Sequence, residues 1–242
     1  MKKYIILHIF DNMRIDIISP LPKLLQAPFS TSILAKAIDK KIVEIHIHDL
    51  RDHSQNKHRK IDDYSYGGGG GMVLMIEPIA NCIQKLQNER TYDSVIFLTP
   101  DGEKLTQKTA NSISQQKNII ILCGRYEGID QRIRDLFIDR EISIGDYVIM
   151  GGELPALVLC ESIIRLLPGS MSNAACALSD SFQDNLLSHP VYTRPANFKG
   201  NRVPDILLSG NEKAISKWRE EQSYQKTQNI RPDLIQKNKE IS

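Results

Sequence analysis

The sequence has few cysteines and no long apolar segment. Its cysteines are Cys82, Cys123, Cys160 and Cys176. They form no CxxC pair and no metal-ligand spacing, so they predict reduced thiols rather than a disulfide framework or a zinc site. No stretch approaches the roughly 20 apolar residues that cross a bilayer, and the apolar run YIILHIF near the N-terminus lacks a signal-peptide cleavage site. We therefore expect a cytoplasmic protein with no membrane partner.

The chain also has little net charge. Lys and Arg number 31 against 29 Asp and Glu, which leaves +2 over 242 residues. This balance excludes a histone-like basic protein, so a nucleic-acid partner would have to be met by local basic patches. Apolar residues make up 41% and charged residues 25%, as in ordinary globular proteins. The length suits one large domain or two unequal ones, and we expect two.

Short β-branched runs alternate with segments of helical periodicity, a pattern typical of an α/β domain with a mostly parallel sheet. The runs at 94–98 and 119–123 are apolar throughout and predict central strands covered on both faces. The run at 42–48 alternates, as a half-exposed strand does. Further expected elements are strands at 15–19 and 141–144 and helices at 76–89, 103–117 and 153–167.

The composition and periodicity of the sequence change after Gly169. Small and polar residues from 170 to 181 show no sustained period. From about residue 183 onward there is no convincing strand, and two helical segments follow at 211–229 and 232–241, the first with Asn211 as its N-cap. The pattern predicts a small, mostly helical C-terminal domain.

Three glycine-rich segments are candidates for a binding site. The tract YGGGGGM at 66–72 is a linker or a loop beside a site, and the apolar run after it favours the loop. It matches neither a P-loop nor a dinucleotide fingerprint. GRYEGID at 124–130 and SIGDYVIMGGELPA at 143–156 both follow expected strands, at the sheet edge where α/β proteins bind ligands. The alternative is two tight turns without a ligand.

Two other polar segments carry weaker signals. RDHSQNKHRKIDD at 51–63 is either a solvated loop or an edge that contacts phosphates. His46 and His48 share one face of a strand, but no third ligand stands at a suitable spacing, so we predict no metal site there.

The glycine-rich segments, followed by ESIIRLLPG, ALSDSF, HPVYTRP and VPDILLSGN, resemble in the same order the bacterial tRNA (guanine-N1)-methyltransferase family, the TrmD family of the SPOUT superfamily. The resemblance begins near Met13; the family usually has a proline where this chain has Gly70. It implies a trefoil-knotted α/β domain, which periodicity alone does not predict because knots are rare. The implied divisions are an N-terminal extension of doubtful origin at 1–12, a SPOUT domain that binds S-adenosylmethionine at 13–170, a linker at 171–185 and a helical tRNA-binding domain at 186–242.

The resemblance implies an enzyme that transfers a methyl group from S-adenosyl-L-methionine to N1 of guanosine 37 in tRNA. It also implies a homodimer with active sites at the subunit interface, and dependence on Mg²⁺, for which the sequence shows no separate ligand set. Carried over residue by residue, the implied methyl-donor pocket comprises Pro100, Gly124, Glu127, Ile144, Gly145, Asp146, Tyr147, Val148, Ile149, Gly151, Gly152 and Pro155.

The acceptor half of that reaction needs a base and a cation, because a proton leaves the ring nitrogen while negative charge builds on O6. Asp180 suits the base, and Arg165 suits the cation, since arginine matches the O6 edge of guanine. The resemblance further implies that Asp180 of one subunit serves the pocket of the other. Without the family resemblance, the alternatives are that Asp180 is a linker residue or helix cap and that Arg165 is a charge at a helix C-terminus. Two other classes are a non-catalytic RNA-binding protein of this fold and a nucleotide-dependent oxidoreductase, which would need the glycine fingerprint that is missing.

Overall fold

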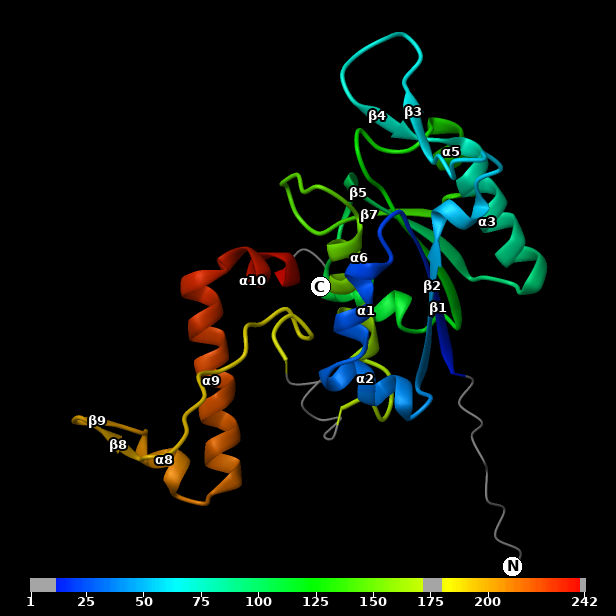
Figure 1. Cartoon of the computed structure of the whole chain (residues 1–242). Helices are drawn as coiled ribbons and strands as arrows, with labels where there is room; N and C mark the ends of the chain where they lie inside the picture. The colour runs from blue at the N-terminus through cyan, green and yellow to red at the C-terminus, as the bar shows by residue number, and fades with distance from the viewer. Residues whose placement is uncertain (1–11, 172–179, 240–242) are drawn as a thin grey trace, which may run out of the picture. The chain divides into compact units, whose positions relative to one another are not determined.

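The computed structural model describes residues 12–171 and 180–239 (Figure 1). The chain divides into two compact units at about residue 172. The N-terminal extension predicted at 1–12 falls almost entirely outside the described residues, as do part of the predicted linker and Cys176. The other cysteines, Cys82, Cys123 and Cys160, are buried free thiols, as expected.

The first unit is built on a five-stranded parallel sheet in the order β2-β1-β6-β5-β7. Its strands are β1 (Met13–Ser19), β2 (Val43–Asp49), β5 (Ser94–Lys104), β6 (Asn118–Cys123) and β7 (Arg140–Ser143). The prediction of a mostly parallel α/β sheet is confirmed. The two wholly apolar runs form the interior strands β5 and β6, and the alternating run forms the edge strand β2.

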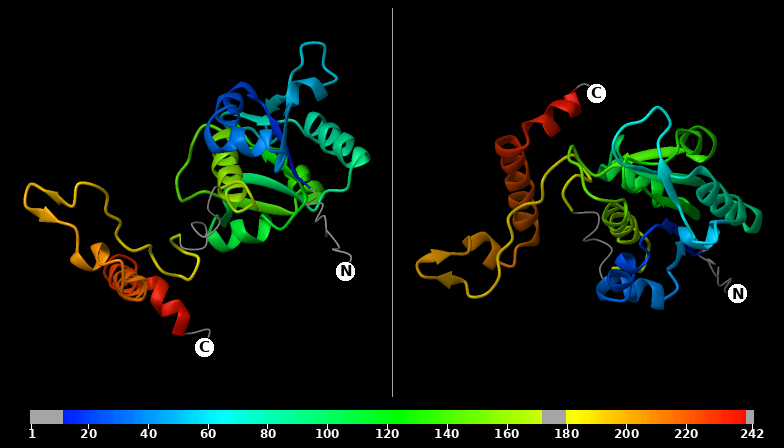
Figure 2. Two further views of the ribbon diagram at one scale, coloured as in Figure 1. Left: turned by 90° about the horizontal axis from the view of Figure 1, so that it is seen from below. Right: turned by 45° about the horizontal axis from the view of Figure 1, so that its top comes forward.

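Helices cover both faces of this sheet (Figures 1 and 2). One face carries α1 (Lys23–Phe29), α2 (Ser32–Asp39), α4 (Gln107–Ile113) and α6 (Glu153–Ile164), and the other carries η1 (Leu50–His53), α3 (Ile76–Glu89) and α5 (Gln131–Phe137). Ile17 belongs to the first core and its neighbour Ile18 to the second, because successive strand residues point to opposite faces. Helix α3 has the predicted bounds, whereas α1 and α2 were not predicted.

The helix predicted at 103–117 is wrong at its start. Strand β5 continues to Lys104 after an irregularity between Leu98 and Glu103, and α4 begins only at Gln107. The extension depends on Gly102, where an added Cβ would lie 2.4 Å from the Glu141 carbonyl carbon. Helix α4 also ends before the predicted residue 117, at Ile113, and the helix predicted at 153–167 ends at Ile164.

The glycine tract is the loop of a β-hairpin. Strand β3 (Asp62–Tyr64) pairs antiparallel with β4 (Met72–Leu74), and the hairpin stands out from the body of the unit (Figures 1 and 2). Gly67, Gly68, Gly69 and Gly71 have positive φ angles. Only glycine adopts these angles without strain, which explains the composition of the loop.

The second unit is mainly helical. It contains α8 (Asp205–Leu208), α9 (Glu212–Ile230) and α10 (Pro232–Lys239). As predicted, Asn211 caps α9, with its side-chain oxygen accepting a hydrogen bond from the Ala214 amide at 3.2 Å. A short hairpin of β8 (Asn197–Phe198) and β9 (Asn201–Arg202) was not predicted. The buried Thr227 hydroxyl accepts a hydrogen bond from the Leu187 amide at 2.8 Å and so attaches α9 to the preceding segment.

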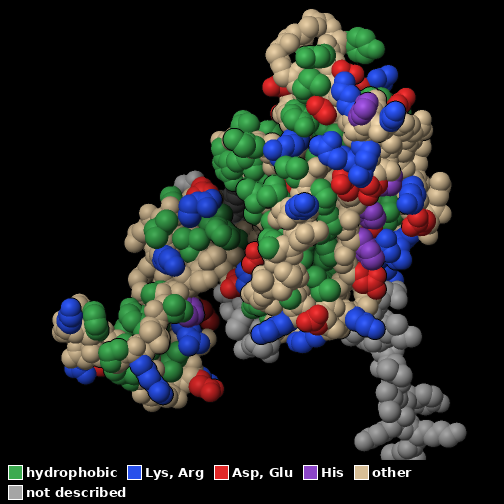
Figure 3. Space-filling model, viewed as in Figure 1, with side chains coloured by type: hydrophobic (Ala, Val, Ile, Leu, Met, Phe, Trp, Pro, Cys, Tyr) green, Lys and Arg blue, Asp and Glu red, His purple; other side chains and the backbone are tan. Residues whose placement is uncertain are grey.

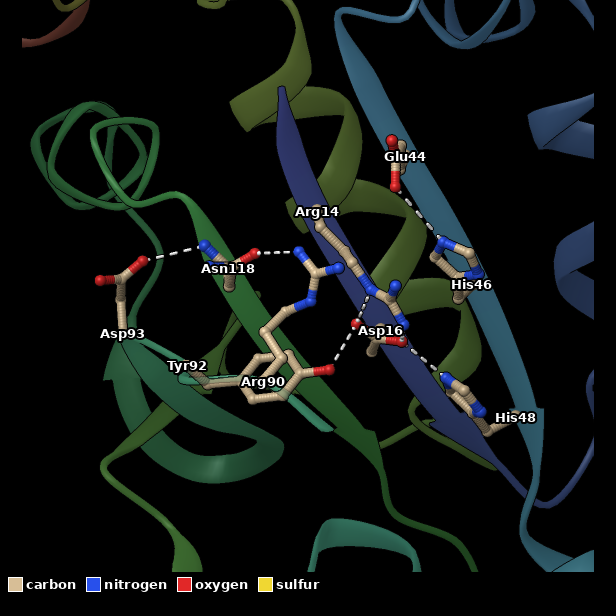
Figure 4. Close-up of polar contacts among 9 residues, drawn as sticks. All are labelled: Arg14, Asp16, Glu44, His46, His48, Arg90, Tyr92, Asp93 and Asn118. Carbon is tan, nitrogen blue, oxygen red and sulfur yellow. Dashed lines mark hydrogen bonds and ion pairs between the residues drawn. The ribbon is translucent and has the colours of Figure 1, made fainter. Parts of the chain in front are cut away.

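A carboxylate is buried in the middle of β1. Asp16 has no exposed surface, yet its oxygens have three cationic or hydroxyl neighbours (Figure 4). Arg14 Nε donates to it at 2.7 Å, Tyr92 Oη donates at 2.8 Å, and His48 Nε2 lies 2.7 Å from Oδ1. A buried charge is tolerated only when it is paired in this way. The cluster thus connects β1 to β2 and to the segment before β5.

These contacts decide the ionisation of the cluster. Burial raises the pKa of Asp16, but the hydrogen bonds from His48, Arg14 and Tyr92 outweigh it and hold that pKa well below its usual value. Burial and the bond to Asp16 raise the pKa of Tyr92, which stays protonated. Because an unfolded Asp titrates near 4, the native state binds fewer protons in acid. The stabilisation by ionised Asp16 is therefore complete above about pH 4 and is lost as the pH falls toward the folded pKa.

Replacing this carboxylate should weaken the fold in a pH-dependent way. We expect Asp16→Asn to lower the free energy of unfolding at pH 7 by about 2 kcal/mol or more, because Arg14 and His48 lose their anionic partner. The control Tyr92→Phe removes one donor and should cost about 1 kcal/mol. Urea denaturation should show the gap between wild type and Asp16→Asn narrowing below about pH 4. A gap that is the same at pH 7 and pH 3.5 would contradict this account.

Candidate functional site

Three loops at the carboxyl edge of the sheet enclose a cavity of about 270 Å³. They follow Leu98 within β5, Cys123 at the end of β6 and Ser143 at the end of β7. Because β5, β6 and β7 are parallel neighbours, their loops meet at one edge. The cavity is lined by residues 97–101, 124–129, 142–145 and 147–152, with Arg134 and Pro155.

Close backbone contact joins two of these loops. The Gly152 amide donates to the Gly124 carbonyl at 2.8 Å, and Arg125 forms an isolated bridge with Gly151. A Cβ on Gly152 would lie 2.7 Å from Cys123 Cα and 2.8 Å from the Gly124 nitrogen. The positions thus require glycine for close approach, and Gly145, at φ +150°, requires it for conformation.

Nearly all of the residues implied as the methyl-donor pocket line this cavity. Those that do are Pro100, Gly124, Glu127, Ile144, Gly145, Tyr147, Val148, Ile149, Gly151, Gly152 and Pro155. Asp146 is the exception: its carboxylate accepts from Lys104 Nζ at 2.6 Å and is exposed. The loops that the glycine pattern singled out therefore converge on one cavity.

Glu127 is an exposed carboxylate on the cavity wall. Its side chain lies against the glycine hairpin, since a Cβ on Gly71 would come within 2.6 Å of Oε1. The Glu127 amide donates to the Met72 carbonyl at 3.0 Å, which ties the wall to β4. Gly71 thus leaves room for the carboxylate at the mouth of the cavity.

Sequence reasoning missed two charged groups of the site. Arg134 on α5 lines the cavity, donates to both oxygens of Glu141 at 2.7 and 2.5 Å and to Asp101 at 3.2 Å, and lies 5.7 Å over the Phe97 ring. The hydrogen bond to Glu141 contributes most to raising the pKa of Arg134, so Arg134 remains a fixed cation. Nothing in the sequence distinguishes it from Arg132, the other arginine of α5.

The second missed group is Glu153, which is almost fully buried at the start of α6. Ser19 Oγ donates to it at 2.8 Å, and Arg125 Nη1 lies 3.9 Å away. An acidic group in the first turn also favours the helix dipole. Glu153 therefore anchors α6 to the end of β1 rather than facing a ligand.

Of the two predicted acceptor residues, Arg165 lies outside the cavity. Arg165 caps the C-terminus of α6, whereas the cavity adjoins its N-terminus at Gly152. The 12-residue helix is about 18 Å long, so Arg165 does not reach the cavity of its own chain. Its Nη2 lies 3.9 Å from the Met171 sulfur. Asp180 is half-buried and belongs to the second unit.

Helix α6 and the loop before it expose an apolar surface (Figure 3). On α6, Leu154 is 57% and Val158 46% exposed, and on the loop Val148 is 84% and Met150 87% exposed. Helices that are apolar on nearly all sides are normally covered. This surface therefore has the character of an interface.

Residues 12–171 and 180–239 contain no group of three or more His, Cys, Asp or Glu side chains that could hold a metal ion. His48 contacts Asp16 and His46 lies 3.6 Å from Glu44, so each histidine of the β2 face has a carboxylate partner (Figure 4). No helix in the same residues combines the length and apolar character needed to cross a bilayer.

Comparison with known proteins identifies the family. The profile described as tRNA (Guanine-1)-methyltransferase TrmD matches residues 13–237. A protein of Christiangramia forsetii is 60% identical over 223 residues, covering 92% of this chain and 99% of its own. Relatives from Flavobacterium johnsoniae and Bacteroides fragilis are 58% and 56% identical, covering 93% of this chain and all of theirs. All three are named tRNA (guanine-N(1)-)-methyltransferase. The resemblance seen in the motifs is confirmed: the chain belongs to the tRNA (guanine-1)-methyltransferase TrmD family.

Proposed function

We propose that this protein transfers the methyl group of S-adenosylmethionine to N1 of guanosine 37 in tRNA. The supporting observation is the cavity at the carboxyl edge of the sheet, where nearly all residues implied for the donor meet in one place. Membership of the family supports the reaction class. The trefoil knot that the family implies is part of the proposal. In such a knot, the close contact of residue 152 with the loop after β6 would hold the threaded segment in place.

The lining of the cavity fits such a donor. Ile144, Ile149 and Pro155 offer apolar surface for an adenine, and the glycines leave backbone groups within reach of its edge. The Glu127 carboxylate would offset a positive sulfonium. Bound there, S-adenosylmethionine supplies an electrophilic methyl group.

We assign the acceptor chemistry to Asp180 and Arg165. The Asp180 carboxylate takes the proton from guanine N1 as the new N–C bond forms and the S–CH3 bond of the donor breaks, its electron pair staying on sulfur as S-adenosylhomocysteine leaves. The Arg165 guanidinium stabilises the negative charge that builds on O6. No described cluster of side chains fits a Mg²⁺ ion, so no step of this mechanism uses one.

A homodimer would bring the two halves together. Arg165 lies the length of α6 from its own cavity, and the exposed apolar surface of α6 calls for a partner. A two-fold contact presents the same surface twice. If the two α6 helices cross in opposite directions, the C-terminus of one approaches the N-terminus of the other, so Arg165 and Asp180 of one subunit serve the cavity of its partner.

The second unit is proposed to bind the tRNA. It has a cavity of about 440 Å³ lined in part by Arg194 and Arg219, and its Tyr192 and Trp218 rings pack 6.5 Å apart. Arginines beside aromatic rings are suited to phosphates and unpaired bases. Trp218 is half-buried and packs against Tyr192 within the unit.

The substrate assignment can be tested with two transcripts. We expect the protein to methylate a tRNA with guanosine at position 37 and to leave its adenosine-37 counterpart unmodified, because only guanine has the N1 proton and the O6 edge. Mapping of the methylated nucleotide by mass spectrometry checks the site. Methylation of both transcripts, or of another position, would overturn the assignment.

The donor site can be tested at Gly152. We expect Gly152→Ala to weaken binding of S-adenosylmethionine at least tenfold in calorimetry, because the new Cβ displaces the Cys123–Gly124 backbone that forms the cavity. The matched control is Gly70→Ala, where a Cβ meets nothing within 4 Å. Circular dichroism checks folding, and Gly124→Ala, which presses only on the Phe97 ring, provides a milder second variant. Unchanged affinity in both Gly152→Ala and Gly124→Ala would remove these loops from the site.

Mixed dimers test the shared site. Asp180→Asn should lower turnover about a hundred-fold or more while leaving donor affinity intact, as expected for loss of a general base. Paired with a Gly152→Ala chain, it leaves one cavity with an intact donor loop and an intact aspartate from the other subunit. That heterodimer should recover up to half of wild-type activity. If the isolated heterodimer is inactive although both parents dimerise, Asp180 acts within its own chain or is not the base.

A further inference from the structure

The β3–β4 hairpin presents two tyrosines to solvent. Tyr66 is fully exposed and Tyr64 is 79% exposed. Tyrosine normally covers much of its ring, because aromatic side chains gain most from burial. Figure 3 shows side chains of the hydrophobic class around the end of this hairpin. We call the hairpin and its loop, residues 62–74, the arm.

The arm is attached firmly to the cavity wall at its base. The Leu74 amide donates to the Gly128 carbonyl at 3.0 Å, and the Asp130 amide donates to the Leu74 carbonyl at 3.1 Å. Leu74 itself is completely buried. Beyond β4, Gly71 lies against the Glu127 side chain at the mouth of the cavity. The arm is therefore an extension of the cavity rim.

The tip of the arm, in contrast, has no packing of its own. A Cβ at Gly67, Gly68 or Gly70 would meet nothing within 4 Å. The tip is held by its own turn, in which Ser65 Oγ donates to the Gly68 carbonyl at 3.0 Å. The arm is thus anchored at its base by Leu74 and unpacked at its loop. Exposed aromatic rings in such a loop are suited to close on a ligand at the cavity rim.

The charged side chains beside the arm argue against phosphate as that ligand. Lys60 Nζ lies 3.0 Å from Asp63, and Arg59 forms an ion pair with Asp52. On the adjoining wall, Arg132 pairs with Asp130 at 2.7 Å. Each of these cations already forms an ion pair with a carboxylate. The groups of the arm that remain to contact a ligand are the flat faces of its tyrosine rings.

A second copy of the chain is also a poor match for the arm. The arm joins the α3 and α5 side of the sheet through Leu74, whereas the exposed apolar surface of α6 lies on the opposite side. Tyr64 and Tyr66 are thus not continuous with that interface.

The proposed reaction creates a specific need for aromatic faces at this rim. Guanine N1 lies on the pairing edge of the base, so the base must leave its stack before it can be methylated. The neighbouring bases then lose a stacking partner, and tyrosine rings can replace it without reading sequence.

We infer that Tyr64 and Tyr66 form a stacking platform for the unpaired bases next to the target guanine of the RNA. This inference rests on the proposed function and adds a substrate-binding element to it. The arm thereby compensates for the stacking lost when the target base is withdrawn, and it acts on RNA binding rather than on donor binding.

The test compares Tyr66→Ala with Tyr66→Phe, which keeps the ring and removes only the hydroxyl. We expect Tyr66→Ala to lower kcat/KM for tRNA about tenfold, mainly through KM, and the Tyr64→Ala/Tyr66→Ala double variant to lower it further. Tyr66→Phe should stay within about twofold of wild type. Calorimetric affinity for S-adenosylmethionine should be unchanged in all variants, which also shows that the cavity is intact.

A second readout reports stacking directly. A tRNA carrying 2-aminopurine next to the target guanine should be less fluorescent in complexes with wild type and Tyr66→Phe than with Tyr66→Ala, because stacking quenches this base. The inference is overturned if the double variant keeps wild-type kcat/KM and quenching while wild type is active, or if it loses self-association instead. A wild type that binds the donor but methylates no tRNA would refute the proposed function, and the platform with it.

Discussion

The hydrogen bond from the Gly152 amide to the Gly124 carbonyl is the contact on which the site depends. It joins the loop after β6 to the loop after β7, closes one wall of the cavity and fixes where α6 begins. No side chain fits there, since a Cβ on Gly152 would collide with the backbone of residues 123 and 124. The position of α6 then determines that Arg165 stands a helix length away from the cavity and that Leu154 and Val158 face outward while the rest of its apolar side packs on the sheet.

The parts of the fold that local patterns determine were predictable. The apolar runs of β5 and β6 and the periodicity of α3 have nearly the bounds that the sequence indicates, because burial on two faces or on one face leaves a distinct period. The polar end of β5 was not predictable. It is a strand only because Gly102 lets it lie against Glu141 and Ile142, a contact made by residues far along the chain. Helix α1 was missed because it is short and contains Pro28.

The candidate site divides in the same way. Motifs of the family singled out the glycine loops, but they do not state which glycine is required by conformation and which by contact; Gly145 and Gly152 differ in this respect. Glu153 escaped notice because its partner, Ser19, is 134 residues away in sequence. Arg134 escaped notice because only the fold brings α5 beside Asp101 and the cavity. Asp146 stands within the motif but bonds to Lys104 and does not line the cavity. Neither outcome can be obtained without the three-dimensional arrangement.

The charges at the cavity indicate why the acceptor chemistry should come from elsewhere. Among the described residues of its wall, Asp101 is engaged by Arg134, and the nearby Glu141 and Glu153 have their own donors. A carboxylate that already accepts hydrogen bonds from a fixed cation is a poor base, because its charged form is stabilised. Glu127 has no such cation, but a negative group beside a sulfonium is better suited to hold the donor than to take a proton. In the proposed mechanism a separate carboxylate would therefore serve the guanine, and Asp180 and Arg165 of the partner subunit would supply base and cation together, only once both chains are in place.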